Sequence, residues 1–254
     1  MILRMFNTIV VSSLNLLSIS GPLYAFENSN LAGKFIILIL FMASLFSWTV
    51  MVVKFSFITT AQKQNRIFLN RFRSAKRPLL LFNSKRHYEP SPLAAIFRQA
   101  ASELCFHLLG SSEIDETFES RLERASHVTP EAMKAVRSSL EQAVSEEALK
   151  IESQLILLAT VVSGAPFLGL LGTVWGVMDA FTDVAQAGNS SLQVLAPGVS
   201  GALLTTIAGL LVAIPAMFGY NFLLNTIRKL TVEMENFSVE CANLFEHQFS
   251  QRKF

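Results

Sequence analysis

Three long runs without charged residues dominate the pattern of hydrophobic and polar positions along the chain. The first covers residues 35–53, between Lys34 and Lys54. As a helix it would measure roughly 28 Å, close to one hydrocarbon core. The second covers residues 155–178, and the third begins near residue 197 and continues to residue 227. This pattern predicts an all-α membrane protein with three transmembrane helices, of which the second and third extend into the cytoplasm.

Polar segments separate these spans and divide the rest of the chain. We expect an N-terminal segment over residues 1–34, periplasmic and amphipathic, and a helical cytoplasmic loop over residues 54–154. A short outer turn should occupy residues 179–196, which contain two aspartates and a Gly-Asn-Ser-Ser stretch. Residues 228–254 should continue the third helix as a cytoplasmic C-terminal helix.

A helix start is encoded in the loop at Thr129, Pro130 and Glu131. Threonine can cap a helix N-terminus, proline suits the first helical position, and an acidic residue there favours the helix dipole. No helix breaker follows before about Val162. The sequence therefore predicts one helix that begins at Pro130 and enters the membrane unbroken as the second span.

The first 26 residues allow two interpretations. Arg4, a moderately apolar run and a Leu-Tyr-Ala ending are typical of a cleaved signal peptide. The run is interrupted by several polar residues: Asn7, Ser12, Ser13, Asn15, Ser18 and Ser20. These interruptions favour an amphipathic helix on the membrane surface, with cleavage as the alternative.

The charges are placed asymmetrically and indicate the topology. Nine Lys or Arg and no Asp or Glu lie between Lys54 and Arg86, so this segment should be cytoplasmic. The N-terminus is then periplasmic and the C-terminus cytoplasmic, and Arg228 and Lys229 agree with that orientation. A nucleic-acid patch is the weaker interpretation, because the cluster directly follows an apolar span. We expect contact with the lipid bilayer and none with nucleic acid.

Composition supports membrane burial and offers little chemistry. Only 16% of the residues are charged, against about 25% in a typical soluble domain, and the mean hydropathy is +0.43. Cys105 and Cys241 lack metal-ligand spacing and should be reduced thiols in the cytoplasm. The histidines also lack ligand spacing: His87, His107, His127 and His247. We expect neither an enzyme nor a metal or cofactor site.

The second and third spans carry small residues at helical spacing, whereas the first is bulky throughout. These residues should allow close helix packing, as in the Gly172-x-x-x-Gly176 pattern. Two interpretations remain open, namely packing between the two helices of one chain and contact with an oligomer or a partner helix. The candidate packing residues are Gly169, Gly172, Gly176, Gly198, Ala202, Gly209 and Ala213.

Polar and kinking residues in these spans complete the pattern. Thr173 and Thr206 should both lie in the outer half of the bilayer, on glycine-rich faces. Pro166 and Pro215 should bend their helices toward the cytoplasmic ends. Neither span contains an Asp, Glu, His, Lys or Arg, and an intramembrane proton path usually needs a carboxylate or a histidine. Any titrating group must therefore come from another chain.

Two blocks carry a resemblance to a known family: "APFLGLLGTVWGVMDAF" at 165–181 and "LAPGVSGALLTTIAGLLVAIPAMFGYN" at 195–221. They resemble the TolQ/ExbB family, which is related to the flagellar stator protein MotA, and the layout agrees over residues 35–250. The resemblance implies a pentamer of long helices in the inner membrane of Gram-negative bacteria. Its second and third helices would line a pore around the transmembrane helix of a TolR/ExbD-like partner, whose aspartate titrates. Proton flow would then drive a TolA/TonB-like protein that spans the periplasm.

The resemblance also assigns residues and exposes one departure. Thr173 and Thr206 match the family's two functional threonines, whereas Gly201 stands where members commonly carry a glutamate. Without that carboxylate, Ser200, Thr205 and water would have to serve, and the expected pore lining comprises all five of these residues. The alternative is a membrane scaffold that keeps the assembly and has lost proton coupling. The TolQ branch is weakly preferred over the ExbB branch, and a membrane enzyme has little support.

Overall fold

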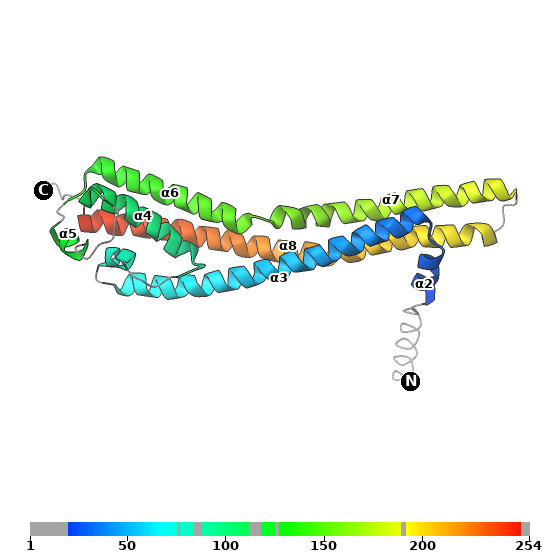
Figure 1. Ribbon diagram of the computed structural model, residues 1–254, viewed down its shortest axis with the longest axis horizontal. Coiled ribbons are helices and arrows are strands. Elements are labelled where there is room, and N and C mark those ends of the chain that lie inside the picture. Colours follow the sequence, from blue (N-terminus) through cyan, green and yellow to red (C-terminus); the bar gives the residue numbers. More distant parts are fainter. Residues whose placement is uncertain are drawn as a thin grey trace, which may run out of the picture. The chain divides into compact units, whose positions relative to one another are not determined.

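The structure is a computed structural model, and it describes residues 20–75, 77–83, 88–111, 118–124, 127–188 and 192–249. Within those residues every regular element is a helix (Figure 1). The elements are α2 (Ser20–Glu27), α3 (Leu31–Ser74), the 3-10 helix η1 (Pro78–Asn83), α4 (Pro92–Leu109), α5 (Phe118–Arg124), α6 (Pro130–Glu152), α7 (Leu155–Ala187) and α8 (Leu192–Phe249). The two interpretations of the first 26 residues fall mostly outside the described residues, which begin at Ser20.

Three of these helices are long and apolar enough to cross a membrane, namely α3, α7 and α8. The prediction of three transmembrane helices is therefore confirmed. The helices are longer than the uncharged runs, since α3 has 44 residues and α8 has 58. The first membrane helix thus continues far beyond residue 53, which the length of the uncharged run does not indicate. The limits of the spans within these helices stay predictions.

The prediction of one unbroken helix from residue 130 to residue 162 is wrong. Thr129 caps α6 as expected, and its side chain accepts a hydrogen bond from the Ala132 amide. However, α6 ends at Glu152, and Gln154 adopts a left-handed backbone with φ of 71°, which is uncommon for a residue with a side chain. The second membrane helix, α7, therefore starts anew at Leu155 and is not a continuation of α6.

A buried lysine explains how the chain breaks there without glycine or proline. Lys54 of α3 is only 5% exposed, and its Nζ donates to the Ile151 carbonyl oxygen at 3.1 Å and to Ser153 Oγ at 3.3 Å. The last carbonyl groups of a helix lack partners within the helix, and a cation is favourable at that end. The Lys54 ammonium meets both needs at the end of α6.

The turn after the second span is shorter than expected. Helix α7 continues through Asp179 and Asp183 to Ala187, and Gly188 follows with φ of 63°. Helix α8 is already formed at Leu192, so Pro197 lies inside the helix and does not start it.

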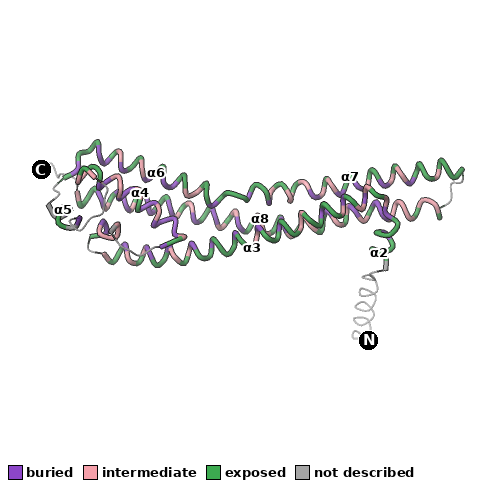
Figure 2. Tube along the Cα trace, in the orientation of Figure 1, coloured by how far each residue is buried: buried purple, intermediate pink, exposed green. Residues whose placement is uncertain are grey.

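The chain forms two compact units. The first comprises the described residues up to Val50 together with 157–219, and so contains α2, the first part of α3, most of α7 and the first part of α8. Ile36 and Leu40 of α3 form a buried cluster there with Ala165 of α7 and Ala213 of α8. Along α7, exposed and half-buried positions predominate (Figure 2). A membrane helix that contacts lipid or another chain is expected to expose large apolar side chains in this way.

The second unit comprises residues 51–156 and the described residues from 220 onward. Its core is aromatic: the rings of Phe68, Phe72, Phe97 and Phe237 pack with centroid distances of 5.1–6.1 Å. Both cysteines are buried free thiols. The expected helical loop is thus a packed helical unit.

Candidate functional site

Two threonine hydroxyls meet on the seam between α7 and α8. Thr173 of α7 and Thr206 of α8 are both half-buried, and their Oγ1 atoms are hydrogen-bonded to each other. Thr173 Oγ1 also lies 3.1 Å from the Ala202 carbonyl oxygen, and Thr206 Oγ1 lies 3.1 Å from the Gly169 carbonyl oxygen. The two threonines therefore lie at the same level along the α7–α8 seam. Their place in the outer half of the bilayer stays a prediction.

The hydroxyl pair can adopt two hydrogen-bond arrangements. Each hydroxyl has one proton to donate, so these contacts are alternatives. In one arrangement Thr173 donates to Thr206, which donates to the Gly169 carbonyl oxygen. In the other, Thr206 donates to Thr173, which donates to the Ala202 or the Gly169 carbonyl oxygen. Both arrangements use every donor. The seam therefore holds a short polar chain whose direction can reverse.

Glycines bring the two helices close enough for these contacts. A Cβ on Gly172 would lie 2.5 Å from Thr205 Oγ1 and 2.7 Å from Thr205 Cβ, so no side chain fits there. An added Cβ would lie within 2.8 Å of an atom of the facing helix at four further positions: Gly169, Gly176, Gly198 and Gly209. Ala202 and Ala213 are buried on α8. All seven candidate packing residues thus lie at contacts within one chain.

Thr205 lies next to Thr206 in sequence but on a different face of α8. Its side chain is fully buried, and Oγ1 lies 2.6 Å from the Ala202 carbonyl oxygen and 3.0 Å from the Gly169 carbonyl oxygen. It fills the space beside Gly172 and approaches Gly33 of α3. The expected pore-lining position of Thr205 does not agree with this burial, because the side chain has no open surface in the chain.

Gly201 lies under the connection between α2 and α3. A Cβ at this position would lie 2.8 Å from Ser29 Cα and 3.1 Å from the Ala25 carbonyl oxygen, and both residues are buried. A glutamate would collide with backbone there. Gly201 is therefore a packing position in this chain, not an open pore-lining one, and no local pattern around it predicts this contact. Its neighbour Ser200 is half-buried on α8.

Comparison with known proteins shows which family the chain belongs to. Residues 110–236, half of the 254-residue chain, match the family model of the MotA/TolQ/ExbB proton channel family. The chain belongs to this family. The matched residues include all of α7 and the part of α8 that faces it. Family membership and the three apolar helices together make it a multi-pass membrane protein.

Individual relatives come from both named branches of the MotA/TolQ/ExbB family. The Tol-Pal system protein TolQ of Haemophilus influenzae is 31% identical over 224 residues, which cover 88% of this chain and 92% of the relative. The TolQ of Pseudomonas aeruginosa is 34% identical over 202 residues, covering 77% of this chain and 79% of the relative. The biopolymer transport protein ExbB of Xanthomonas campestris is 40% identical over 110 residues, covering 43% of this chain and 44% of the relative.

Asp179 has a structural role that sequence reasoning missed in this MotA/TolQ/ExbB family member. Asp179 is the first residue of the predicted outer turn, but in the structure it is half-buried on α7 and its Oδ2 accepts a hydrogen bond from the Asn30 side chain. Asn30 Oδ1 in turn accepts from the Gly33 amide at 2.7 Å and caps the start of α3. An asparagine just before an apolar run was the available signal. Asp179 thereby connects α7 to the first turn of α3.

The remaining candidates add no chemistry. Pro166 lies inside α7 and Pro215 inside α8, and both helices continue through them. Burial raises the pKa of the Cys105 thiol to about 11, so this cysteine is neutral at ordinary pH and unsuited to nucleophilic work. Among the described residues, no group of three or more His, Cys, Asp or Glu side chains could hold a metal ion.

Proposed function

We propose that this chain is an inner-membrane subunit of a TolQ/ExbB-like motor complex driven by the proton-motive force. The observation that carries the proposal is the Thr173–Thr206 hydroxyl pair, set on a close-packed seam between two spans that contain no Asp, Glu, His, Lys or Arg. The names of the relatives, a Tol-Pal system protein and a biopolymer transport protein, support this kind of function.

The hydroxyl pair can line a proton path, but it does not itself bind the proton that crosses the membrane. A threonine hydroxyl accepts one hydrogen bond while it donates another, so the pair can relay a hydrogen-bond direction at constant charge. A carrier must also titrate, and the spans of this chain contain no carboxylate or histidine. The carrier is then an intramembrane aspartate on a single-span TolR/ExbD-like partner.

The full assembly in this proposal is a homo-pentamer around that partner. The N-terminus of each subunit is periplasmic and its C-terminus cytoplasmic, and the complex drives a TolA/TonB-like protein across the periplasm. It serves envelope integrity or outer-membrane transport. The energy is adequate, because one charge crossing 100 mV releases about 2.3 kcal/mol.

The pore lining is narrower in this proposal than the resemblance alone implied. Thr173 and Thr206 keep surface that a partner helix could contact, since both are half-buried. Thr205 is buried against Gly172 of α7, and Gly201 packs against Ala25 and Ser29, so both residues contact other parts of the same chain. The polar route therefore depends on two threonines, with Ser200 the nearest further hydroxyl toward the outer end of α8.

A second candidate is a scaffold that assembles with the same partners but does not conduct protons. Gly201 favours it, because the position lacks the carboxylate that family members commonly carry. A gene for a single-span protein with an intramembrane aspartate, beside the gene for this chain, would favour the motor.

Substitution of the two threonines tests the motor. Thr173→Val and Thr206→Val keep the side-chain shape and remove the hydroxyl, so each should reduce function that depends on the proton-motive force by roughly tenfold or more. Thr182→Val is the matched control, because Thr182 is exposed on α7 and its hydroxyl donates to the Met178 carbonyl oxygen of the same helix. Thr173→Ser and Thr206→Ser should retain most of the activity.

The readout is complementation of a strain that lacks its own homologue, scored for detergent resistance and for outer-membrane uptake. The two scores separate the TolQ and ExbB branches. Full activity of both valine variants at normal expression would refute the motor role of the hydroxyl pair. Normal assembly with unimpaired complementation would instead support the scaffold.

A further inference from the structure

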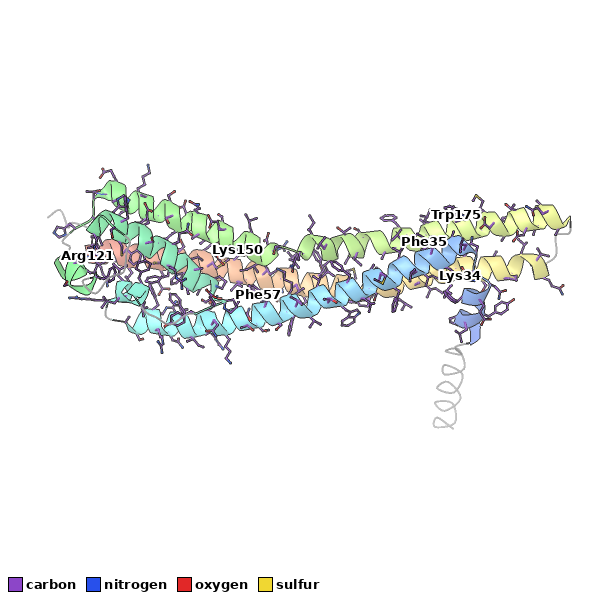
Figure 3. The ribbon with its side chains drawn as sticks, viewed as in Figure 1. Lys34, Phe35, Phe57, Arg121, Lys150 and Trp175 are labelled. Atoms are coloured by element: carbon purple, nitrogen blue, oxygen red, sulfur yellow. The ribbon has the colours of Figure 1, made fainter. Side chains whose placement is uncertain are left out.

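A groove on the membrane unit runs between the start of α3 and the outer half of α7. Its volume is about 900 Å³, and its walls are almost wholly apolar, with Phe35 and Ile39 from α3 and Leu168, Leu171 and Trp175 from α7. Figure 3 labels Lys34, Phe35 and Trp175 in this part of the unit. Phe35 is 62% exposed and Trp175 is 46% exposed, so the groove is open along its side.

Opposite charges lie at one end of this groove. Lys34 and Asp179 both line it, and each stands immediately outside an uncharged run. Lys34 Nζ donates to the Glu27 carbonyl oxygen at 3.0 Å, and Asp179 Oδ2 accepts from Asn30. Among the residues that the structure describes, neither charge has an ion-pair partner. The Lys34 ammonium keeps two N–H groups for a ligand, and Asp179 keeps its second oxygen.

The apolar part has the depth of one membrane leaflet. Leu168 precedes Asp179 by 11 positions on α7, which corresponds to about 16 Å along the helix. Half of a typical hydrocarbon core is about 15 Å. The groove therefore combines a charged end at the membrane boundary with an apolar length that matches one acyl chain.

We propose that this groove binds a phosphatidylethanolamine molecule from the leaflet on the side of the α7–α8 turn. The lipid phosphate lies on the Lys34 ammonium, the lipid primary ammonium donates to Asp179, and an acyl chain lies against Leu171 and Trp175. Phosphatidylglycerol offers the phosphate but no cation, and the quaternary ammonium of phosphatidylcholine has no N–H to donate. This inference rests on the membrane spans alone and does not require the proton path.

Tryptophan quenching tests the site in the full-length chain. Trp48 and Trp175 are the two tryptophans of the sequence, so Trp48→Phe leaves Trp175 as the single reporter. The protein is reconstituted in phosphatidylcholine bilayers with increasing fractions of a lipid brominated on its acyl chains, which is phosphatidylethanolamine, phosphatidylglycerol or phosphatidylcholine in turn. Brominated phosphatidylethanolamine should reach half-maximal quenching at roughly a fivefold lower mole fraction than brominated phosphatidylcholine.

Charge variants should separate the two headgroup contacts. Asp179→Asn should remove the preference for phosphatidylethanolamine over phosphatidylcholine. Lys34→Gln should weaken quenching by brominated phosphatidylglycerol as well as by brominated phosphatidylethanolamine. Asp183→Asn is the matched control, because Asp183 is exposed on the same helix and does not line the groove. It should leave all three quenching curves unchanged.

Three results would overturn the proposal. Equal quenching by phosphatidylethanolamine and phosphatidylcholine in the Trp48→Phe protein would show ordinary lipid contact, and this comparison needs no charge variant to fold. Equal effects of Asp179→Asn and Asp183→Asn on the quenching curves would contradict the proposed contact between Asp179 and the lipid headgroup. Absence of quenching by any brominated lipid would mean that protein, such as a second copy of the chain, covers the groove.

Discussion

Gly172→Ala should destabilise the seam between α7 and α8 by an amount set by one buried contact. The new Cβ would lie 2.5 Å from Thr205 Oγ1, 2.7 Å from Thr205 Cβ and 2.9 Å from Thr205 Cγ2. A rotation of the Thr205 side chain moves only Oγ1 and Cγ2, because Cβ is fixed to the backbone. The helices must then separate, and the hydroxyl contacts across the seam lengthen.

The magnitude follows from a comparison with Gly164→Ala on the same helix, where an added Cβ would meet nothing within 4 Å. Both substitutions gain the same helix propensity, about 0.5–1 kcal/mol, which cancels in the difference. Overpacking of a well-packed interior costs about 1–3 kcal/mol. Gly172→Ala should therefore be less stable than Gly164→Ala by about 2 kcal/mol, which is roughly a 30-fold difference in the unfolding equilibrium.

Reversible unfolding in mixed detergent and SDS micelles, followed by circular dichroism, measures this difference. Thr205→Ala removes two of the three colliding atoms, so it should recover part of the loss when combined with Gly172→Ala. Equal stability of Gly172→Ala and Gly164→Ala would refute the close approach of the two helices. A fully additive double variant would show that Thr205 is not the residue that the new methyl group meets.

Two further predictions concern the second unit. Lys54→Met should lower the free energy of unfolding by about 1–3 kcal/mol and speed amide exchange at the end of α6, because the Ile151 carbonyl loses its donor. Lys63 is exposed on α3, so Lys63→Met should change neither the stability nor the exchange rate. Burial raises the pKa of the Cys105 thiol from 9.0 to about 11, so in a Cys241→Ala background its alkylation should be slow at pH 7.5 and should accelerate as the pH approaches 11. The protonated thiol is favoured by folding, so its stabilising effect is complete below pH 9 and is lost as the pH rises to about 11; an alkylation rate at pH 7.5 equal to that of the SDS-unfolded chain would contradict the burial.

The sequence predicted the spans well because their signal is local. Uncharged length alone located α3, α7 and α8, and the capping pattern located the start of α6. The break at Gln154 escaped prediction, since it has neither glycine nor proline and depends on Lys54, about a hundred residues earlier in the chain. A contact of that kind leaves no trace in the local pattern.

The candidate site was predictable only in part, for a related reason. Thr205 and Thr206 are consecutive in sequence, yet successive residues on a helix point about 100° apart. Both hydroxyls reach the Gly169 carbonyl of α7, but only the Thr206 hydroxyl is hydrogen-bonded to the Thr173 hydroxyl. Periodicity identifies the faces but does not say which face meets which neighbour. The contact between Gly201 and Ser29 likewise depends on where the N-terminal segment runs.

The packing at Gly201 implies a constraint on how such chains can diverge. The Ser29 backbone occupies the volume that a side chain at position 201 would need. A chain with a side chain at this position therefore cannot also place the segment before its first span there. A relative with a large residue at this position must route the segment before its first span elsewhere, and a relative with glycine is free to keep it there. We therefore expect the residue at this position and the path of the preceding segment to change together across the family.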